Sequence, residues 1–310
     1  MKKLFGKLLL LTVIITIMLA FIGIQFSRGI YDPFYNRLAT PKASSMVIGT
    51  SRAAQGLVPH ILNDELSGSC LKPSIINFAF TLGHSPYGPA YLRLIKEKLV
   101  DTVQSGVFIV AVDPWAVSNL NKQEREVFSF RENKRFVNEV KFSDINPNFE
   151  YIFKHYDGPL YKLLLPNSGK TKLHYNGWLE VNISRDSIAY ERALKSKLKV
   201  YEKYLQTASI SSIRLRSLEE TIKVLKSHGK VYLVRMPVAK EMADLENQYS
   251  PEFDSLMKKL AYEAKVPFLN YLPESGKYKT TDGNHLQKES GTLFSKNLAR
   301  DILRLETKCS

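Results

Sequence analysis

The chain has 310 residues, of which 44% are hydrophobic and 24% charged, a composition typical of a folded protein with a substantial core. Its formal net charge is +14, but the basic residues are interspersed with acidic ones and no nucleic-acid-binding motif is present. The sequence therefore argues against a nucleic-acid-binding protein. A surface close to anionic lipid or to an anionic polymer fits this charge better.

The first segment is the most apolar part of the sequence. Leu8 to Phe26 carries no charge, and about 20 such residues are enough to cross the hydrocarbon core of a bilayer as a helix. The lysines before it favour a cytoplasmic N-terminus, with the rest of the chain outside the cytoplasm. A cleaved signal peptide begins similarly, but this run is long for one and no small-x-small site precedes Ser27. We expect residues 1–28 to form a cytoplasmic tip and signal anchor of a single-pass cell-membrane protein.

After a connector at residues 29–42, apolar runs alternate with amphipathic segments. Strands are predicted at 46–48, 74–78, 107–112, 231–234 and 266–270. Helices are predicted at 59–66, from Ser85-Pro86 to about 99, around 218–225, from Pro251 to about 264, and at 288–305. Strands that alternate with crossover helices predict an α/β fold, flavodoxin-like, with three α/β/α layers and about five parallel strands.

Residues 116–185 interrupt this alternation. They are rich in charged and aromatic residues and contain turn clusters such as Asp157-Gly-Pro. A mostly polar helix is predicted to follow at 186–207. We expect 116–207 to form an insertion, or cap, over the strand ends of one α/β domain that spans 43–310.

Candidate catalytic residues follow the predicted strands, on the side where parallel sheets bind ligands. Ser51 follows the first strand at a strand-to-helix turn, which exposes its hydroxyl beside free helix N–H groups. His285 lies between the fifth strand and the last helix, and Asp282 precedes it by three residues. Alone, the serine is more often a helix cap and the Asp-His pair a surface turn. Together they predict a triad in which His285 activates Ser51 and Asp282 orients His285.

These motifs resemble those of the SGNH, or GDSL-like, hydrolases. That superfamily places its serine directly after the first strand in a Gly-x-Ser motif, which Gly49-Thr-Ser51 matches. Its Asp-x-x-His motif before the C-terminal helix is matched in type, spacing and position by Asp282-Gly-Asn-His285. The resemblance covers the alternating core and implies an acyl-ester enzyme without a cofactor. It also implies that the oxyanion is held by the N–H groups of Ser51 and Gly83.

Two positions depart from the superfamily's pattern. The aspartate that usually precedes the serine is Thr50, and Asp113 stands where the oxyanion asparagine is expected. These departures and the apolar start make the chain similar to membrane-tethered members, the DltD-like and alginate O-acetylation proteins. That likeness implies acyl transfer to, or removal from, a cell-envelope or exported polysaccharide, commonly beside a membrane-bound O-acyltransferase. The alternative is a catalytically silent SGNH-like scaffold or polymer-binding partner of such a transferase.

Four further residues are candidates for substrate binding because they lie on the same side of the predicted sheet: Arg52, His84, Asp113 and Arg235. Arg52 equally suits a pair with a local acid, and His84 equally suits a cap of the next helix. The two tryptophans, Trp115 and Trp178, either stack on sugar rings or, more often for such residues, pack between cap and core.

No metal site is predicted, because the sequence contains neither an HExxH motif nor paired cysteines at ligand spacing. The two cysteines, Cys70 and Cys309, either form a disulfide in an oxidising compartment or remain free thiols.

Overall fold

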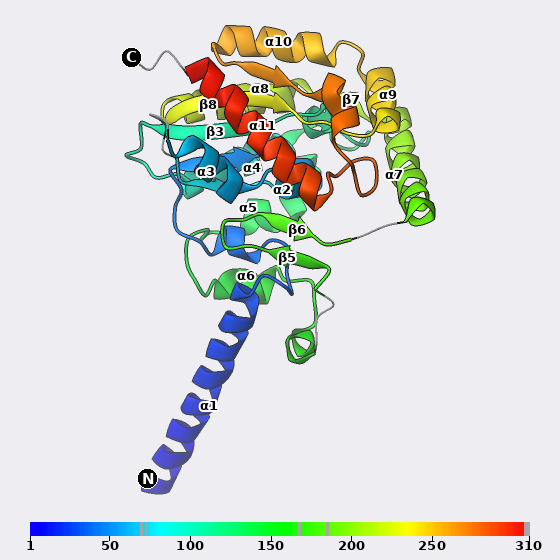
Figure 1. The fold of residues 1–310 in the computed structure, drawn as a ribbon. Helices are drawn as coiled ribbons and strands as arrows, with labels where there is room; N and C mark the ends of the chain where they lie inside the picture. The colour runs from blue at the N-terminus through cyan, green and yellow to red at the C-terminus, as the bar shows by residue number, and fades with distance from the viewer. Residues whose placement is uncertain (69–70, 72, 166–168, 184–185, 307–310) are drawn as a thin grey trace.

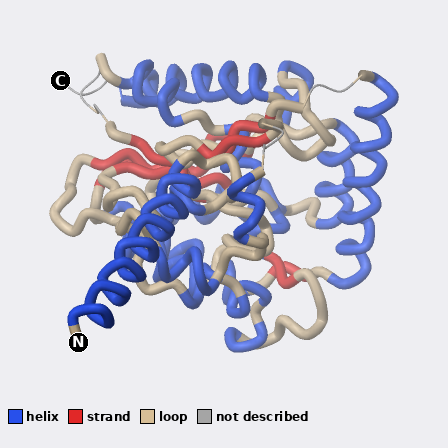
Figure 2. The backbone as a smooth tube through the Cα atoms, turned by 90° about the horizontal axis from the view of Figure 1, so that it is seen from below, coloured by secondary structure: helices blue, strands red, loops and turns tan. Residues whose placement is uncertain are grey.

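The centre of the molecule is a sheet of five parallel strands in the order β2-β1-β3-β8-β9 (Figures 1 and 2). The computed structural model describes all residues except 69–70, 72, 166–168, 184–185 and 307–310. The strands are β1 (Ser45–Ile48), β2 (Ile75–Asn77), β3 (Gly106–Ala111), β8 (Gly229–Arg235) and β9 (Phe268–Asn270). Each overlaps a predicted strand, so the predicted α/β fold with about five parallel strands is confirmed.

Helices cover both faces of this sheet because alternate strand residues point to opposite sides. Val107 and Ile109 of β3 pack in one apolar cluster, whereas Phe108 and Val110 pack in another. The first cluster includes residues of α2 (Ser51–Gly56), α3 (Pro59–Leu66) and α11 (Lys288–Glu306). The second includes residues of α4 (Pro89–Lys98), α8 (Ser212–Lys226) and α10 (Phe253–Ala264). All six residues of β3 are buried, which explains its uninterrupted apolar run.

One predicted helix start was wrong. We expected Ser85-Pro86 to open the helix after β2, but α4 begins at Pro89. The Ser85 hydroxyl instead donates to the Gly49 carbonyl at 2.8 Å and accepts from the Phe80 N–H at 3.1 Å. Because Ser85 is completely buried, these bonds tie the loop after β2 to the end of β1.

The segment between β3 and α8 consists of short elements followed by one long helix. It starts and ends at an antiparallel pair, β4 (Ser118–Asn119) and β7 (Ser209–Ile210). Between these strands lie a second antiparallel pair and helices: α5 (Phe136–Glu139), α6 (Phe149–Lys154), β5 (Thr171–Leu173), β6 (Leu179–Val181) and α7 (Ser187–Thr207). Trp115 stacks on Tyr249 at 4.5 Å and the Trp178 indole N–H donates to the Gln55 carbonyl, so both tryptophans pack inside the protein.

Short helices complete the chain. They are η1 (Tyr35–Leu38), η2 (Pro114–Val117), η3 (Val127–Ser129), η4 (Arg131–Lys134), η5 (Leu160–Leu164), η6 (Leu272–Lys277) and α9 (Lys240–Tyr249). The sequence interpretation did not anticipate α9. It packs Met242 and Leu245 with Trp115 in a small third apolar cluster.

The N-terminal helix α1 (Lys2–Ser27) projects away from the domain (Figure 1). It has 26 residues, and an 18-residue stretch within it has a mean hydropathy of 2.6, so it is long and apolar enough to cross a membrane. Only Ile22, Gly23 and Phe26, at its C-terminal end, are buried. Cys70 and Cys309, considered above as a disulfide pair, lie outside the described residues.

Candidate active site

Ser51 stands at the first position of α2, where the chain leaves β1 through a sharp turn. Gly49 has φ +149°, and a Cβ at that position would lie 2.9 Å from Cβ of Ala111 on the neighbouring strand. The turn therefore requires glycine. The first backbone bond of the helix runs from Ala54 N–H to the Thr50 carbonyl, so the N–H groups of the first turn precede the helical ladder. These groups lie next to the serine hydroxyl.

The second half of the site is the loop between β9 and α11. Asp282 accepts the backbone N–H groups of Asn284 and His285 with Oδ1, at 3.1 and 3.0 Å. Gly283 has φ +83°, a left-handed conformation that glycine adopts without strain, and a Cβ there would meet Leu194 of α7. The loop closes with the bond from Thr281 N–H to the His285 carbonyl. This tight turn aims Asp282 and His285 in defined directions.

The structure brings Ser51, His285 and Asp282 together across more than two hundred positions of sequence. Nε2 of His285 lies 2.8 Å from Oγ of Ser51. Nδ1 of the same ring lies 3.0 and 3.1 Å from the two carboxylate oxygens of Asp282. Because a carboxylate only accepts, Nδ1 carries the proton and Nε2 is left to accept from the serine hydroxyl. This is the arrangement in which a histidine removes a proton from a serine nucleophile.

Asp282 is held ionised by its neighbours. Burial alone would raise the pKa of this carboxyl, but the hydrogen bond and charge of His285, the charge of Lys197 and the Asn284 N–H outweigh it and hold the pKa well below its usual range. Nζ of Lys197, on α7, lies 3.1 Å from Oδ2 of Asp282. A helix of the segment between β3 and α8 therefore supplies a direct partner to the acid.

Asn284 lies between Asp282 and His285 in the loop sequence and is buried beside the histidine. Its Oδ1 accepts from Nε and Nη2 of Arg52 at 3.0 and 2.7 Å. A guanidinium only donates, so these two bonds assign the oxygen to the arginine side and the amide nitrogen to the other side. Nδ2 then lies 3.2 Å from Nε2 of His285. The site thus contains a fixed side-chain N–H donor next to the proposed nucleophile.

Glu246 of α9 holds Arg52 in place. This carboxylate is completely buried and accepts from Arg52 Nη2 at 2.5 Å, from Arg235 Nη2 at 3.2 Å and from the indole N–H of Trp115 at 3.2 Å. Arg235 also pairs with Asp254. Both arginines are buried and bonded within the protein, so their positions do not support the predicted role in substrate binding. For Arg52, the structure shows the alternative, a pair with a nearby acid, which is Glu246.

Asp113 is also engaged with the protein itself. Its Oδ1 accepts from the Ala116 N–H at the start of η2, and its Oδ2 accepts from the hydroxyl of Thr50 at 3.2 Å. Burial raises the pKa of this carboxyl, although the charge of Arg52 opposes the shift. Thr50 and Asp113, the two residues that depart from the SGNH-like pattern, are therefore bonded to each other, and Thr50 immediately precedes Ser51. These bonds do not support substrate binding by Asp113.

His84 packs between aromatic rings instead of facing the triad. Its ring lies 4.7 Å from that of Phe34 and stacks at 4.8 Å on Phe136, and Nδ1 lies 2.6 Å from the Thr81 hydroxyl. Burial lowers the pKa of this imidazole to about 4, and the charge of Arg135 adds to the shift. The structure therefore gives His84 a packing role, neither the substrate contact nor the helix cap that the sequence suggested.

Gly83 lies in the turn before His84. A Cβ at this position would meet only Oγ1 of Thr81, at 3.7 Å, so the position is open on its outer side. Within the described part of the chain, its N–H forms no hydrogen bond, which leaves the group free for a ligand.

Three residues of the site escaped the sequence interpretation. Asn284 was visible inside the Asp-x-x-His motif, but only the structure shows that its amide is oriented by Arg52. Lys197 and Glu246 carried no sequence signal, because each reaches the site from a helix outside the recognised motifs.

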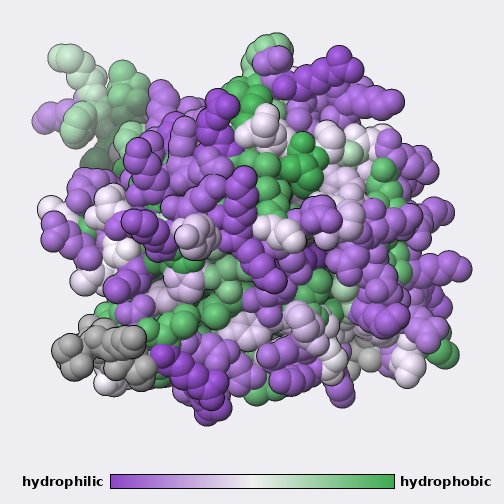
Figure 3. Space-filling model, turned by 90° about the horizontal axis from the view of Figure 1, so that it is seen from above, coloured by the Kyte–Doolittle hydropathy of each residue, from purple (hydrophilic) through white to green (hydrophobic). Residues whose placement is uncertain are grey.

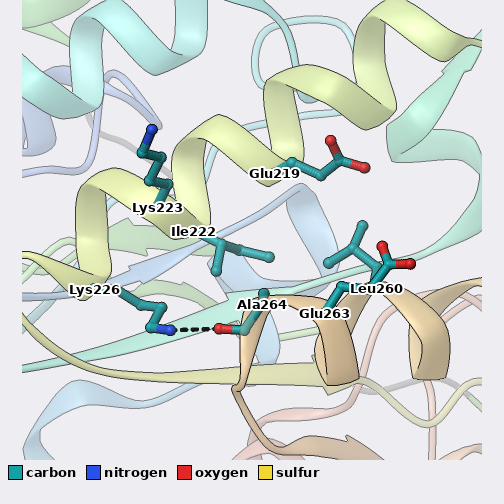
Figure 4. Close-up of a pocket in the computed structure, with 7 residues that line it drawn as sticks. All are labelled: Glu219, Ile222, Lys223, Lys226, Leu260, Glu263 and Ala264. Atoms are coloured by element: carbon teal, nitrogen blue, oxygen red, sulfur yellow. Dashed lines mark hydrogen bonds between the residues drawn. The ribbon is translucent and has the colours of Figure 1, made fainter.

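Two hollows lie outside the triad. A groove of about 1440 Å³ runs between α7, the start of α9 and residues 275–280, and basic residues outnumber acidic ones along it. The basic ones are Arg192, Lys195, Lys199, Lys240 and Lys279. A smaller pocket of about 410 Å³ lies between α8 and α10, and its lining includes Lys226 and Ala264, which are joined by a hydrogen bond from Nζ to the carbonyl oxygen (Figure 4). Neither is lined by Ser51 or His285. Among the described residues, no cluster of three or more His, Cys, Asp or Glu is placed to hold a metal ion.

Comparison with known proteins gives only distant likenesses. No protein-family model and no curated protein sequence matches the chain. Among solved structures, it is similar to a carbohydrate acetylesterase from Sinorhizobium meliloti, at 13% identity and a TM-score of 0.35. It is also similar to the inhibitor-bound aryl esterase of M. smegmatis, at 10% identity and a TM-score of 0.36. Both matches cover 84% of this chain and 99% of the other. The function proposed below rests on the geometry of the site.

Proposed function

We propose that this protein is a membrane-anchored, extracytoplasmic acyl-ester enzyme of the SGNH type, an O-acyltransferase or esterase that modifies a cell-envelope or exported polysaccharide. The observation that carries the proposal is the continuous hydrogen-bond relay from Ser51 Oγ through His285 to Asp282. A serine hydroxyl is a weak nucleophile until a base of this kind removes its proton.

The chemistry proceeds in two steps. Oγ of Ser51 attacks the acyl carbonyl carbon while its proton passes to Nε2 of His285, and the carbonyl π pair moves to the oxygen. The tetrahedral intermediate then collapses, the bond to the leaving oxygen breaks, and His285 returns the proton to that oxygen. A hydroxyl of the acceptor or a water molecule next attacks the acyl-enzyme by the reverse sequence. The same residues therefore serve transfer and hydrolysis.

Charge on the carbonyl oxygen requires hydrogen-bond donors. The proposed donors are the N–H of Ser51 at the start of α2 and the N–H of Gly83. Nδ2 of Asn284 joins them, because it is a fixed donor beside the nucleophile and Asp113, two residues after β3, stands in place of the expected asparagine. When ionised, the Asp113 carboxylate can only accept hydrogen bonds, so it cannot donate one to the oxyanion. Its two oxygens already accept from Thr50 and Ala116.

The cellular setting is proposed from α1 and from the charge of the domain. An apolar helix of this length preceded by lysines suits a single-pass anchor with a cytoplasmic N-terminus. The basic groove beside α7 suits an anionic polysaccharide. A membrane-bound O-acyltransferase is the proposed partner that would deliver or receive the acyl group. No cofactor or metal enters the proposed chemistry.

Asp113 supports a second candidate, a catalytically silent scaffold that binds polymer or recruits the acyltransferase. An oxyanion site that lacks one donor loses about 10²–10³ in rate. In this candidate, the triad geometry persists without turnover.

Labelling of the full-length protein in detergent with a fluorophosphonate separates the two candidates. The enzyme is expected to form a covalent adduct on Ser51, and Ser51→Ala is expected to abolish it. The matched control is Ser187→Ala, an exposed serine at the start of α7, which is expected to keep full labelling. No adduct on the wild-type protein, together with full function of Ser51→Ala in cells, would establish the scaffold.

A further inference from the structure

The helix α1 is docked firmly onto the domain at its C-terminal end. The Phe26 ring is buried and packs 5.2 Å from Tyr35 and 4.8 Å from Tyr156. Gly23 lies so close to Pro147 that a Cβ would come within 2.9 Å of it. The Ser27 hydroxyl donates to Oδ1 of Asn146 at 3.2 Å. These contacts fix the direction in which the domain leaves the helix, and with it the face that lies next to the helix.

That face carries an unusual number of exposed large apolar side chains. Single exposed apolar residues are normal on protein surfaces, whereas a concentration of them marks an interaction surface. Seven lie within residues 142–165, which also provide the Pro147 and Asn146 contacts to α1. We call these seven residues the apolar rim: Phe142, Ile145, Phe153, Leu160, Tyr161, Leu164 and Leu165.

The most exposed part of the apolar rim is tied to the end of α1. The Tyr31 hydroxyl, four residues beyond the helix, lies 3.4 and 3.3 Å from the carbonyl oxygens of Leu163 and Leu165. Leu163 is buried, whereas Leu164 next to it is 73% exposed. In Figure 1, the chain just before the grey trace at 166–168 descends beside the upper part of α1. This is the level at which a membrane-spanning α1 would leave the bilayer.

The opposite face of the domain has a different character. The view from above, over α10 and α11, shows mostly hydrophilic side chains (Figure 3). The apolar rim is therefore not a general property of the surface. The same stretch of chain, residues 142–165, also carries the exposed Lys154 and Lys162. These lysines suit the headgroup region, because basic residues near a bilayer are attracted to anionic lipids. Tyr161, 62% exposed, is of the residue type enriched at membrane–water interfaces.

We propose that the apolar rim inserts into the interfacial layer of the bilayer that holds α1, giving the protein a second, non-spanning membrane contact. The occupant is lipid, because the rim continues the apolar surface of the anchor helix. The proposal rests on the membrane anchoring proposed above. It adds that the catalytic domain is held at a fixed height and tilt instead of swinging on a flexible tether, since both α1 and the rim are joined to the same residues.

Tryptophan quenching by brominated lipid tests the proposal in the full-length chain. Three single variants are placed in nanodiscs of phosphatidylcholine and phosphatidylglycerol, with and without brominated acyl chains: Leu164→Trp in the rim, Ile14→Trp within α1 and Tyr262→Trp on α10. Tyr262 is 85% exposed and reports the surface away from α1. The native Trp115 and Trp178 are buried and give a constant background, measured with the unsubstituted chain.

We expect strong quenching at position 14, quenching of about twofold at position 164, as for a side chain in the acyl–headgroup boundary, and background quenching at position 262. Quenching at 14 with only background at 164 would overturn the membrane contact of the rim and leave the anchor intact. In that case the rim does not enter lipid, and a partner protein would be the alternative occupant. Background quenching at both 14 and 164 would overturn the anchor and this inference together. Each outcome is independent of enzyme activity.

Discussion

The side-chain amide nitrogen of Asn284 lies 3.2 Å from Nε2 of His285, the same ring nitrogen that lies 2.8 Å from the Ser51 hydroxyl. In the resting site, Nε2 is an acceptor for both groups. When His285 takes the serine proton, Nε2 becomes a donor and no longer accepts from the amide. The Asn284 N–H is then free for a negatively charged oxygen on the substrate. A donor released at this moment stabilises the transition state more than the ground state, which is the condition for faster chemistry.

Removal of the Asn284 donor is expected to slow acylation. Asn284→Ala and Asn284→Asp should each lower kcat/KM for p-nitrophenyl acetate by about 10², the typical effect of losing one oxyanion donor. The aspartate variant keeps an oxygen for Arg52 and so preserves this packing contact, but it replaces the donor with a carboxylate oxygen whose charge also opposes the oxyanion. The alanine variant removes the donor without adding a charge. The control is Gln287→Ala, a loop amide that donates to the Thr280 carbonyl. Wild-type rates in both Asn284 variants would show that the amide has no part in the reaction.

Lys197 is expected to set the pH range of the reaction. Its ammonium lies 3.1 Å from the Asp282 oxygen that also faces His285, so it shares the carboxylate charge with the imidazolium formed during acylation. Lys197→Met removes this competition and favours the protonated ring. The acid limb of the kcat/KM profile should therefore move to higher pH, by roughly a few tenths of a unit. Lys203→Met, at an exposed position of the same helix outside the basic groove, serves as the control. An unchanged profile, or a shift to lower pH, would contradict this role.

Glu246 is expected to be essential for stability. Glu246→Gln leaves the buried guanidinium groups of Arg52 and Arg235 without their shared carboxylate. Removing one partner of a buried ion pair typically costs about 3–5 kcal/mol, and urea unfolding measures the loss. Fluorophosphonate labelling of the folded fraction should also slow, because Arg52 no longer holds Asn284. Glu241→Gln, an exposed position on the same helix, should change neither quantity. A stable, fully reactive Glu246→Gln would refute the supporting role of this carboxylate.

His84 is expected to make the fold sensitive to acid. Its pKa is lowered to about 4 in the folded protein, so between that value and about 6.5 the unfolded chain binds more protons than the folded one. Its stabilising contribution is therefore complete above about pH 6.5 and is lost as the pH falls towards 4. Between pH 7 and 4.5 the wild type should lose roughly 1–3 kcal/mol more than His84→Phe, which keeps the aromatic packing and cannot titrate. Urea unfolding at the two pH values measures both losses. If the wild type and His84→Phe lose the same free energy of unfolding, His84 is not the source of the acid sensitivity.

The amino-acid pattern determined the layers of the fold and the local form of the site. Apolar strand runs such as that of β3 report burial on both faces, and the three- and four-residue spacing of α11 reports a single buried face. These signals are local, so five strands and most helices could be predicted. The serine turn and the Asp-x-x-His loop are likewise short segments whose chemistry is readable without a fold. The start of α4 was misplaced because Ser85 has the side chain of a helix cap but bonds to Gly49 instead.

Only the tertiary structure decided which side chains meet. Arg52 and Arg235 are ordinary basic residues in the sequence, and their burial on Glu246 depends on how α9 packs against the strand ends. The same holds for Lys197, which reaches Asp282 from α7. Sequence periodicity shows that a face is buried but not what covers it, because the partner lies far along the chain and is set by the topology. The triad was predictable as a set of residues; the amide beside it, and the arginine that orients the amide, required the fold.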